Sequence, residues 1–287
     1  MPNLKAIKVR IKSIKSTKKI TQAMKLVSAS KVRRAQIKVL SSRPYTEKVN
    51  SFVASTVSAM PYQERQEIPL MAIRKIKSTG IIVITSDRGL CGSCNTNVIK
   101  KATRRILELK GKGLIPKLIL IGSKASNFFR RTNIEILDSF TKLPAAPTVE
   151  LANLIASSCE KAFLEKNVDG IEIIGTDFKS MIRNEVYIKH FLPITPSHET
   201  SGPEILFEPS LASVLDSLLP LYLSNVIFHA LLEAVCSELA SRMNAMSNAT
   251  KNAEELIGAL TNIYNKARQA AITQELAEIV GGVEALK

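Results

Sequence analysis

The stretch from Leu221 to Lys287 carries the pattern that most constrains the fold of this chain. It contains no proline, and apolar residues recur in it at helical spacing: Leu231, Val235, Leu239, Met243, Met246, then Ala253, Leu256, Leu260, Ile263 and Ala267. The spacing predicts one helix of roughly 90 Å, since a helix rises about 1.5 Å per residue. Helices of globular proteins usually end within about 20 residues, so this length favours a coiled coil or rod over a docked terminal helix.

The last turns of this predicted helix are apolar, which is unusual at a chain end. The apolar residues are Leu276, Ile279, Val280, Val283 and Leu286. Such an end needs to be buried, and the rest of the chain offers no obvious cover. We therefore expect this apolar tip to be enclosed by something outside the chain.

A second long helix is predicted at the N-terminus, because residues 3–42 contain neither glycine nor proline. Leu4, Ile7, Ile11 and Ile14 have the spacing of a coiled-coil seam. Beyond them the expected seam passes through the polar residues Thr17, Lys18 and Thr21, and it resumes at Met24 and Val27. The narrow stripe predicts an antiparallel pair with the C-terminal helix. Pro44 predicts a break or kink, after which apolar spacing continues to about Met60.

Charge is distributed unevenly along this basic chain, whose net charge is +15. The first forty residues hold twelve lysines and arginines and no acid, whereas the last sixty hold more acids than bases. A basic helix of this kind is also typical of nucleic-acid or membrane-surface binding. The first forty residues contain no aromatic side chain to stack on bases, which weakens the nucleic-acid reading. We expect no membrane-length apolar run, no direct membrane insertion and no signal peptide.

The middle of the chain changes from helical to strand periodicity at Gly80. Short β-branched runs alternate with helical stretches, which predicts a small, mostly parallel α/β sheet with helices on its faces. The expected strands are 81–84, 118–121, 171–174 and, nearer an edge, 186–191, and the expected helices lie near 96–110 and 149–166.

The loop after the first predicted strand, Thr85 to Asn95, suggests two weak enzymatic alternatives. It lacks both glycine-rich phosphate motifs, and Asp87 would repel an anion, so a nucleotide site is disfavoured. Cys91 and Cys94 have redox-motif spacing, but neither Cys159 nor Cys236 completes a zinc set. The three histidines, His190, His198 and His229, share no metal or triad spacing. We expect no catalytic residue, metal or cofactor; a nucleotide or redox enzyme and a nucleic-acid binder remain the alternatives.

Several motifs resemble the gamma subunit of F-type ATP synthases, the central rotor shaft. They are residues 14–31 (IKSTKKITQAMKLVSASK), 42–45 (SRPY), 242–246 (RMNAM), 264–275 (YNKARQAAITQE) and 278–281 (EIVG). The loop at 89–95 is also similar, although Ser93 and Cys94 stand where the family usually has glycine and leucine. Gly281-Gly282 replaces the usual Gly-Ala, which loosens the last turn.

The resemblance implies three segments: an N-terminal coiled-coil helix (1–60), a central Rossmann-like α/β foot (75–205) and a long C-terminal coiled-coil helix (208–287). It implies a non-catalytic subunit that couples proton flow to ATP synthesis or hydrolysis. The implied partners are the alpha and beta subunits of the catalytic ring, the epsilon subunit and the membrane c-ring, and no nucleic acid. The implied location is peripheral, on the cytoplasmic face of the bacterial inner membrane.

The resemblance also implies roles for individual residues. Arg242 and Gln269 match positions that contact the catalytic ring, with Met24 and Lys25 on the facing part of the N-terminal helix. The apolar tip would sit in the sleeve of that ring. Phe207 and Glu208 match the foot near the membrane ring, and Ile205 stands close by where some relatives have an aromatic residue.

Overall fold

This computed structural model describes the backbone of residues 4–195 and 211–284, and the chain divides into two compact units. The two-helix unit comprises Met1–Ala29 and Arg242–Lys287, and the sheet unit comprises Ser30–Ser241. Helices α1 (Leu4–Ala59) and α6 (Leu211–Glu284) each contribute to both units. The units therefore cut across the three segments named from the sequence.

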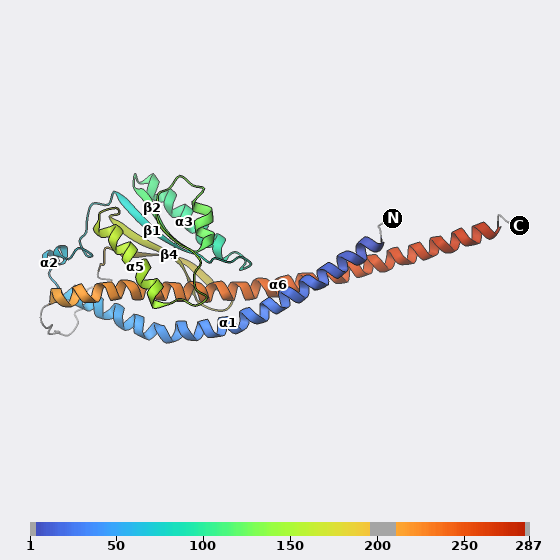
Figure 1. Ribbon diagram of the computed structural model, residues 1–287, viewed down its shortest axis with the longest axis horizontal. Helices are drawn as coiled ribbons and strands as arrows, with labels where there is room; N and C mark the ends of the chain where they lie inside the picture. Colours follow the sequence, from blue (N-terminus) through green and yellow to red (C-terminus); the bar gives the residue numbers. More distant parts are fainter. Residues whose placement is uncertain (1–3, 196–210, 285–287) are drawn as a thin grey trace. The chain divides into compact units, whose positions relative to one another are not determined.

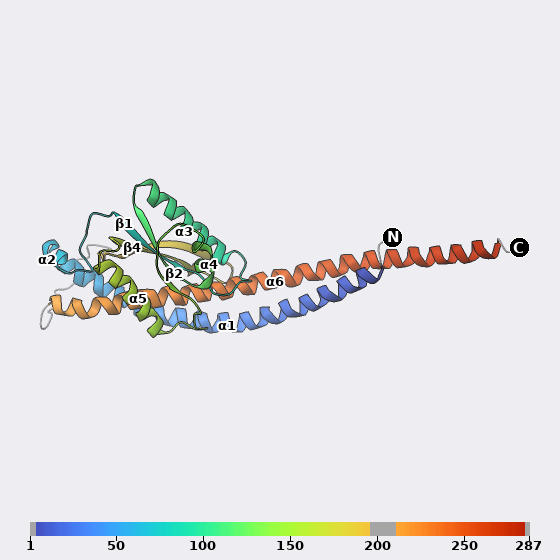
Figure 2. The ribbon, with the colours of Figure 1, turned by 45° about the horizontal axis from the view of Figure 1, so that its top comes forward.

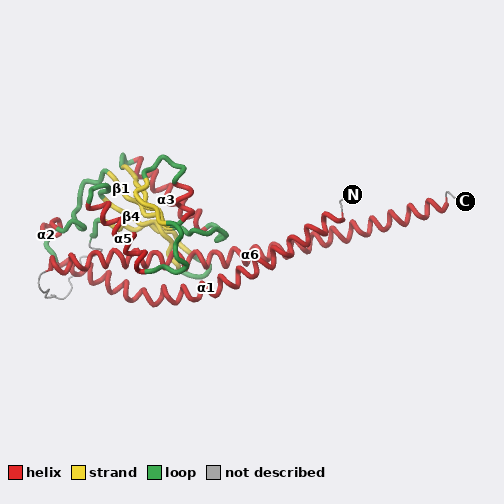
Figure 3. Tube along the Cα trace, viewed as in Figure 1, coloured by secondary structure: helices red, strands yellow, loops and turns green. Residues whose placement is uncertain are grey.

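The sheet unit contains one five-stranded sheet in the order β3-β2-β1-β4-β5. Figure 3 draws its strands in yellow. Its strands are β1 (Ser78–Ile84), β2 (Ile115–Ile121), β3 (Ile136–Phe140), β4 (Gly170–Phe178) and β5 (Asn184–Leu192). The first four run parallel, and β5 pairs antiparallel with β4. The predicted fold class, a small and mostly parallel α/β sheet between long terminal helices, is confirmed. Strand β3 escaped prediction because its five residues are all half-buried and contain two polar side chains.

Helices cover both faces of this sheet (Figure 1). Helices α3 (Cys94–Gly111) and α4 (Ser123–Phe129) pack on one face, and α5 (Val149–Leu164) and α6 pack on the other. Alternate residues of β1 show the division: Ile81 and Val83 join the α3 side, and Ile82 and Ile84 join the α5 side. Because both faces are covered, the central strands read as continuous apolar runs. A short helix, α2 (Tyr62–Glu67), follows α1.

Both long helices contain a proline without being broken. The break or kink predicted at Pro44 is not a break, since α1 continues from Leu4 to Ala59. Likewise α6 begins at Leu211 and contains Pro220. Both prolines are exposed, so each removes one helical hydrogen bond on the solvent side while buried neighbours such as Val39 and Thr46 stay packed.

Helix α6 is also apolar enough to meet a length-and-composition test for a membrane span. Between Val214 and Gly282 it contains an 18-residue window with a mean hydropathy of 1.6. The expectation that no apolar run reaches this length was therefore too strict. Within the described residues, 44% of the window is buried inside the protein, and Leu219, Leu223 and Ile227 belong to the main core. A buried core helix passes the same test, so the window is weak evidence for a span.

Candidate functional site

The two-helix unit pairs α1 and α6 in antiparallel orientation through polar contacts across their seam. The Thr250 hydroxyl lies 2.9 Å from the Thr21 hydroxyl, and Lys18 Nζ lies 2.5 Å from Glu254 Oε1. Residues on the buried side of α1 recur at a period of 3.5: Leu4, Ile7, Ile11, Ile14, Lys18, Thr21, Lys25 and Ser28. The predicted return of the seam at Val27 was wrong, because that side chain is 56% exposed. The heptad instead continues through polar residues.

The polar middle of the seam favours one register over others. The Thr21 hydroxyl has the Lys18 carbonyl as an acceptor within its own helix, and the single proton of the Thr250 hydroxyl is shared between the Met246 carbonyl and Thr21. Polar seam residues generally cost stability and specify how helices align. A slip along the seam would separate Lys18 from Glu254.

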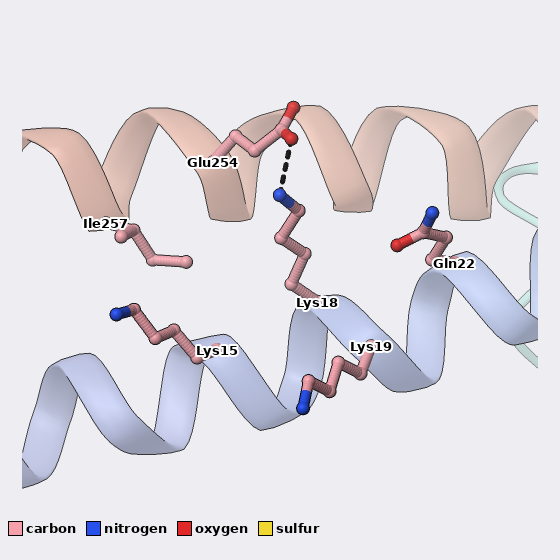
Figure 4. Close-up of a pocket in the computed structure, with 6 residues that line it drawn as sticks. All are labelled: Lys15, Lys18, Lys19, Gln22, Glu254 and Ile257. Atoms are coloured by element: carbon pink, nitrogen blue, oxygen red, sulfur yellow. Dashed lines mark ion pairs between the residues drawn. The ribbon is translucent and has the colours of Figure 1, made fainter.

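A pocket of about 350 Å³ lies beside this ion pair. Its lining residues are Lys15, Lys18, Lys19, Gln22, Glu254 and Ile257. Figure 4 shows Lys18 reaching from α1 to Glu254 on α6, while Lys19 points away from α6. Hydrogen bonding to Lys18 lowers the pKa of Glu254, so the carboxylate stays ionised. Three ammonium groups against one carboxylate leave the pocket positively charged.

The far end of α6 extends beyond the start of α1 (Figure 2). Every residue from Ile272 to Gly282 is exposed, including Leu276 (58%), Ile279 (64%) and Val280 (62%). The Val283 side chain and Leu286 lie outside the described residues. The described part of the apolar tip therefore has no cover within its unit.

The expected ring-contact residues fall into two groups. Continuing the antiparallel register of the Thr21–Thr250 pair places Met24 and Lys25, both half-buried, opposite Ser247 and Met246, about one helical turn from Arg242. The Arg242 side chain is itself buried. Gln269 is exposed and lies roughly 40 Å farther along α6, at 1.5 Å per residue. The expected foot contacts, Phe207 and Glu208, lie outside the described residues.

In the sheet unit, the loop after β1 uses its polar groups to hold neighbouring loops. Asp87 accepts hydrogen bonds from Ser123, through both its backbone N–H and its hydroxyl, and from the Leu143 N–H. Burial alone would raise the pKa of Asp87, but these hydrogen bonds outweigh it and the pKa is lowered. An added Cβ at Gly122 would lie 2.2 Å from the Thr85 carbonyl oxygen, so the loop fits tightly against the next one. Sequence reasoning read Asp87 only as a group that repels anions and missed this role.

The cysteine pair in that loop has a packing explanation. Cys91 is buried, and its sulfur lies 3.1 Å from Asn95 Nδ2, which also bonds Ser86. Cys94 begins α3 and is half-buried. Among the described residues, no group of three or more His, Cys, Asp or Glu side chains is placed to hold a metal ion.

Comparisons with known proteins agree with this architecture. Residues 3–286 match the family model described as ATP synthase. ATP synthase gamma chains from Nostoc sp. and Synechocystis sp. are 44% and 42% identical to this chain, with 100% of this chain and of each relative aligned.

Solved structures give the same result at the level of the fold. One similar chain comes from the central stalk and c-ring of the Tetrahymena thermophila mitochondrial ATP synthase, at a TM-score of 0.60 and 26% identity. That match covers 80% of this chain and 99% of the other. A chain of the Euglena gracilis mitochondrial ATP synthase has a TM-score of 0.70 at 19% identity, covering 99% of this chain and 94% of the other.

Proposed function

Because this chain belongs to the gamma-chain family of ATP synthases, we propose that it is the rotor shaft of an F-type enzyme. The alpha and beta subunits of the catalytic ring would enclose the two-helix unit. The foot, with Phe207 and Glu208, would meet the epsilon subunit and the membrane c-ring. The location would be peripheral, on the cytoplasmic face of the bacterial inner membrane. The observation that carries the proposal is the exposed apolar end of α6.

The apolar tip suits a dry sleeve. Leu276, Ile279 and Val280 are each more than half exposed. Burying the rest of such a side chain contributes about 1 kcal/mol, so a sleeve that covers all three stabilises the assembly substantially. If the sleeve is lined by apolar side chains, it makes no directional hydrogen bonds with the tip. The tip can then rotate without breaking such bonds.

The proposed coupling needs asymmetry rather than catalysis. A single shaft presents a different face to each copy of a ring subunit, and unequal contacts can bias otherwise identical nucleotide sites. We assign these contacts to Arg242, Gln269, Met24 and Lys25. The ATP ligands would come from the ring. In the loop after β1, the Asp87 carboxylate already accepts hydrogen bonds from Ser123 and Leu143.

The first test is the composition of the complex that contains this chain. An affinity tag on its exposed sheet unit should recover alpha, beta, epsilon and c subunits from solubilised membranes. The expected ratio is one copy of this chain to three catalytic subunits. Recovery of the chain alone, or with ATP turnover of its own, would reject the proposal.

The second test concerns the tip itself. Changing Ile279→Asp together with Val280→Asp should weaken assembly with the ring by at least about tenfold, since unpaired carboxylates are costly to bury. Glu278→Gln on the same turn is the matched control and should assemble normally. Normal assembly of the double variant would show that no dry sleeve encloses this end.

A further inference from the structure

A buried charged cluster in the sheet unit joins α1, α6 and the end of β4. The Glu233 side chain on α6 is only 5% exposed. Its Oε1 accepts a 3.0 Å hydrogen bond from Arg43 Nη2 on α1, and its Oε2 accepts a 2.8 Å bond from the Phe178 N–H. The same Arg43 nitrogen donates to the Phe178 carbonyl at 3.1 Å. We call Arg43, Glu233 and the Phe178 backbone the clasp.

The surroundings of the clasp are mostly apolar. The third hydrophobic cluster of the sheet unit consists of Val32, Val39, Phe178, Leu232, Cys236 and Ala240. His229 Nε2 lies 3.5 Å from Glu233 Oε1, and His229 Nδ1 lies 3.3 Å from the Ser42 hydroxyl. Glu233 is therefore the group on which side chains from both helices converge.

The start of β5 is tied to the same helix. Asn184 Nδ2 donates to the Ser237 carbonyl at 3.2 Å and to the Ser241 hydroxyl at 3.1 Å. The β4–β5 hairpin is thus bonded to α6 at two levels, one through Glu233 and one a turn or two farther along.

Stability alone is a poor explanation of this arrangement. A buried ion pair adds little net stability, and well-packed apolar residues of similar size often replace it at no cost. Apolar packing, however, is non-directional, so helices can rotate or slide against it. Charge-assisted hydrogen bonds require a defined distance and angle, so they oppose such movement.

We propose that the clasp is the joint that holds the sheet in rotational register with α1 and α6 under load. Arg43 and Glu233 are then positioning residues for rotary coupling. This inference rests on the proposed function, because only a rotor subunit carries torque between its foot and its helices.

The test replaces both charges at once, Arg43→Met with Glu233→Leu, in the assembled complex. The change keeps the volume and removes the directional bonds. A matched control, Lys161→Met with Glu165→Leu, removes an exposed ion pair of the same unit. Subunit composition, thermal unfolding, ATP hydrolysis and ATP-driven proton pumping are measured in membranes from each strain.

We expect the clasp variant to assemble and to unfold at a somewhat lower temperature than the parent, because the buried Phe178 N–H loses its acceptor. Protons pumped per ATP hydrolysed should fall roughly fivefold, a change typical of coupling between sites. The control should match the parent in every measurement. A clasp variant that assembles and pumps at the parental ratio would overturn the inference and leave the proposed function intact. A parental complex that lacks this chain or does not pump would overturn the proposed function itself.

A second variant separates coupling from folding. Glu233→Gln has nearly the same shape and keeps one acceptor oxygen, so its pumping ratio should lie between those of the parent and the double variant. If neither variant assembles, the clasp serves folding rather than coupling, and the inference is wrong.

Discussion

The two units of this chain are stabilised by different means. The sheet unit has three hydrophobic clusters, and its central strands are buried along their whole length. In the described part of the two-helix unit, no residue belongs to these clusters, and the seam includes Lys18, Thr21 and Lys25. Two helices cannot enclose a core, so the apolar seam residues Leu4, Ile7, Ile11 and Ile14 stay half-exposed, while the small polar Thr21 and Ser28 are buried. The sheet unit therefore buries its own apolar surface, whereas the two-helix unit leaves Leu276, Ile279 and Val280 exposed.

The largest expected effect is a loss of stability caused by a cavity in the core of the sheet unit. Phe163 is fully buried between α5 and the sheet, and Arg74 stacks over its ring at 4.5 Å. Changing Phe163→Ala should lower the free energy of unfolding by about 3–5 kcal/mol, because it leaves a large cavity. Denaturant unfolding of the purified chain, followed by circular dichroism, measures this. The neighbouring Leu164→Ala, at a 41% exposed position, is the control, and an equal loss there would contradict the reasoning.

A proline in the two-helix unit should act locally. Ala267 is half-buried in the seam, and Ala267→Pro should destabilise the end of α6 by about 3 kcal/mol and kink it. Denaturant unfolding of the sheet unit should not change, because no hydrophobic cluster includes the site. In membranes, proton pumping should fall more than ATP hydrolysis, with Ala267→Ser as control. Fully coupled pumping by the assembled proline variant would disprove the shaft role of this helix.

Mild acid should lower the stability of the sheet unit and leave that of the two-helix unit almost unchanged. Burial lowers the pKa of His229, an effect that Lys189 and Arg43 reinforce and that Glu233 and Asp177 oppose. The folded state therefore binds this proton less readily than the unfolded state. Stability of the sheet unit is then complete above the unfolded pKa of about 6.5 and falls as the pH drops below it.

The measurement compares thermal unfolding at pH 7.5 and pH 5.5 for the parent and for His229→Asn. The variant should show a smaller dependence on pH. The two-helix unit contains no histidine, so its unfolding should change little over this range. An unchanged pH dependence in the variant would mean that His229 does not carry the effect.

The smallest expected effect lies in the seam. Replacing both threonines, Thr21→Val with Thr250→Val, removes their 2.9 Å contact and leaves no polar group behind. Such paired replacements are close to neutral, so unfolding should shift by less than about 0.5 kcal/mol. The more sensitive measurement is the register of the two helices. Cysteines engineered across the seam should form the native-register disulfide less selectively in the double variant than in the parent. A loss of several kcal/mol would show that the seam contributes more stability than its exposure suggests.

Local periodicity was enough to predict the main elements from the sequence. The apolar spacing of α1 and α6, and the β-branched runs of β1, β2 and β4, are properties of neighbouring residues, and the structure has each of them. The polar seam was only partly predictable. Its apolar beginning at Leu4 is visible in the sequence, but the residues that follow the heptad through Lys25 and Ser28 are not apolar, so composition pointed to Val27 instead.

The pairing of the two terminal helices was predicted from the sequence, but individual side-chain contacts between distant segments were decided by the tertiary structure alone. Arg43 and Glu233 are 190 residues apart, and neither lies in a pattern that predicts a pair. In the sequence, Asp87 indicated only that the loop would repel an anion. The structure shows that its carboxylate holds neighbouring loops through Ser123 and Leu143. Pro44 predicted a break or kink, and α1 continues through it from Leu4 to Ala59. The sequence determines which residues form helices and strands, because that depends on neighbours, whereas charge pairs and helix continuity depend on what packing brings together.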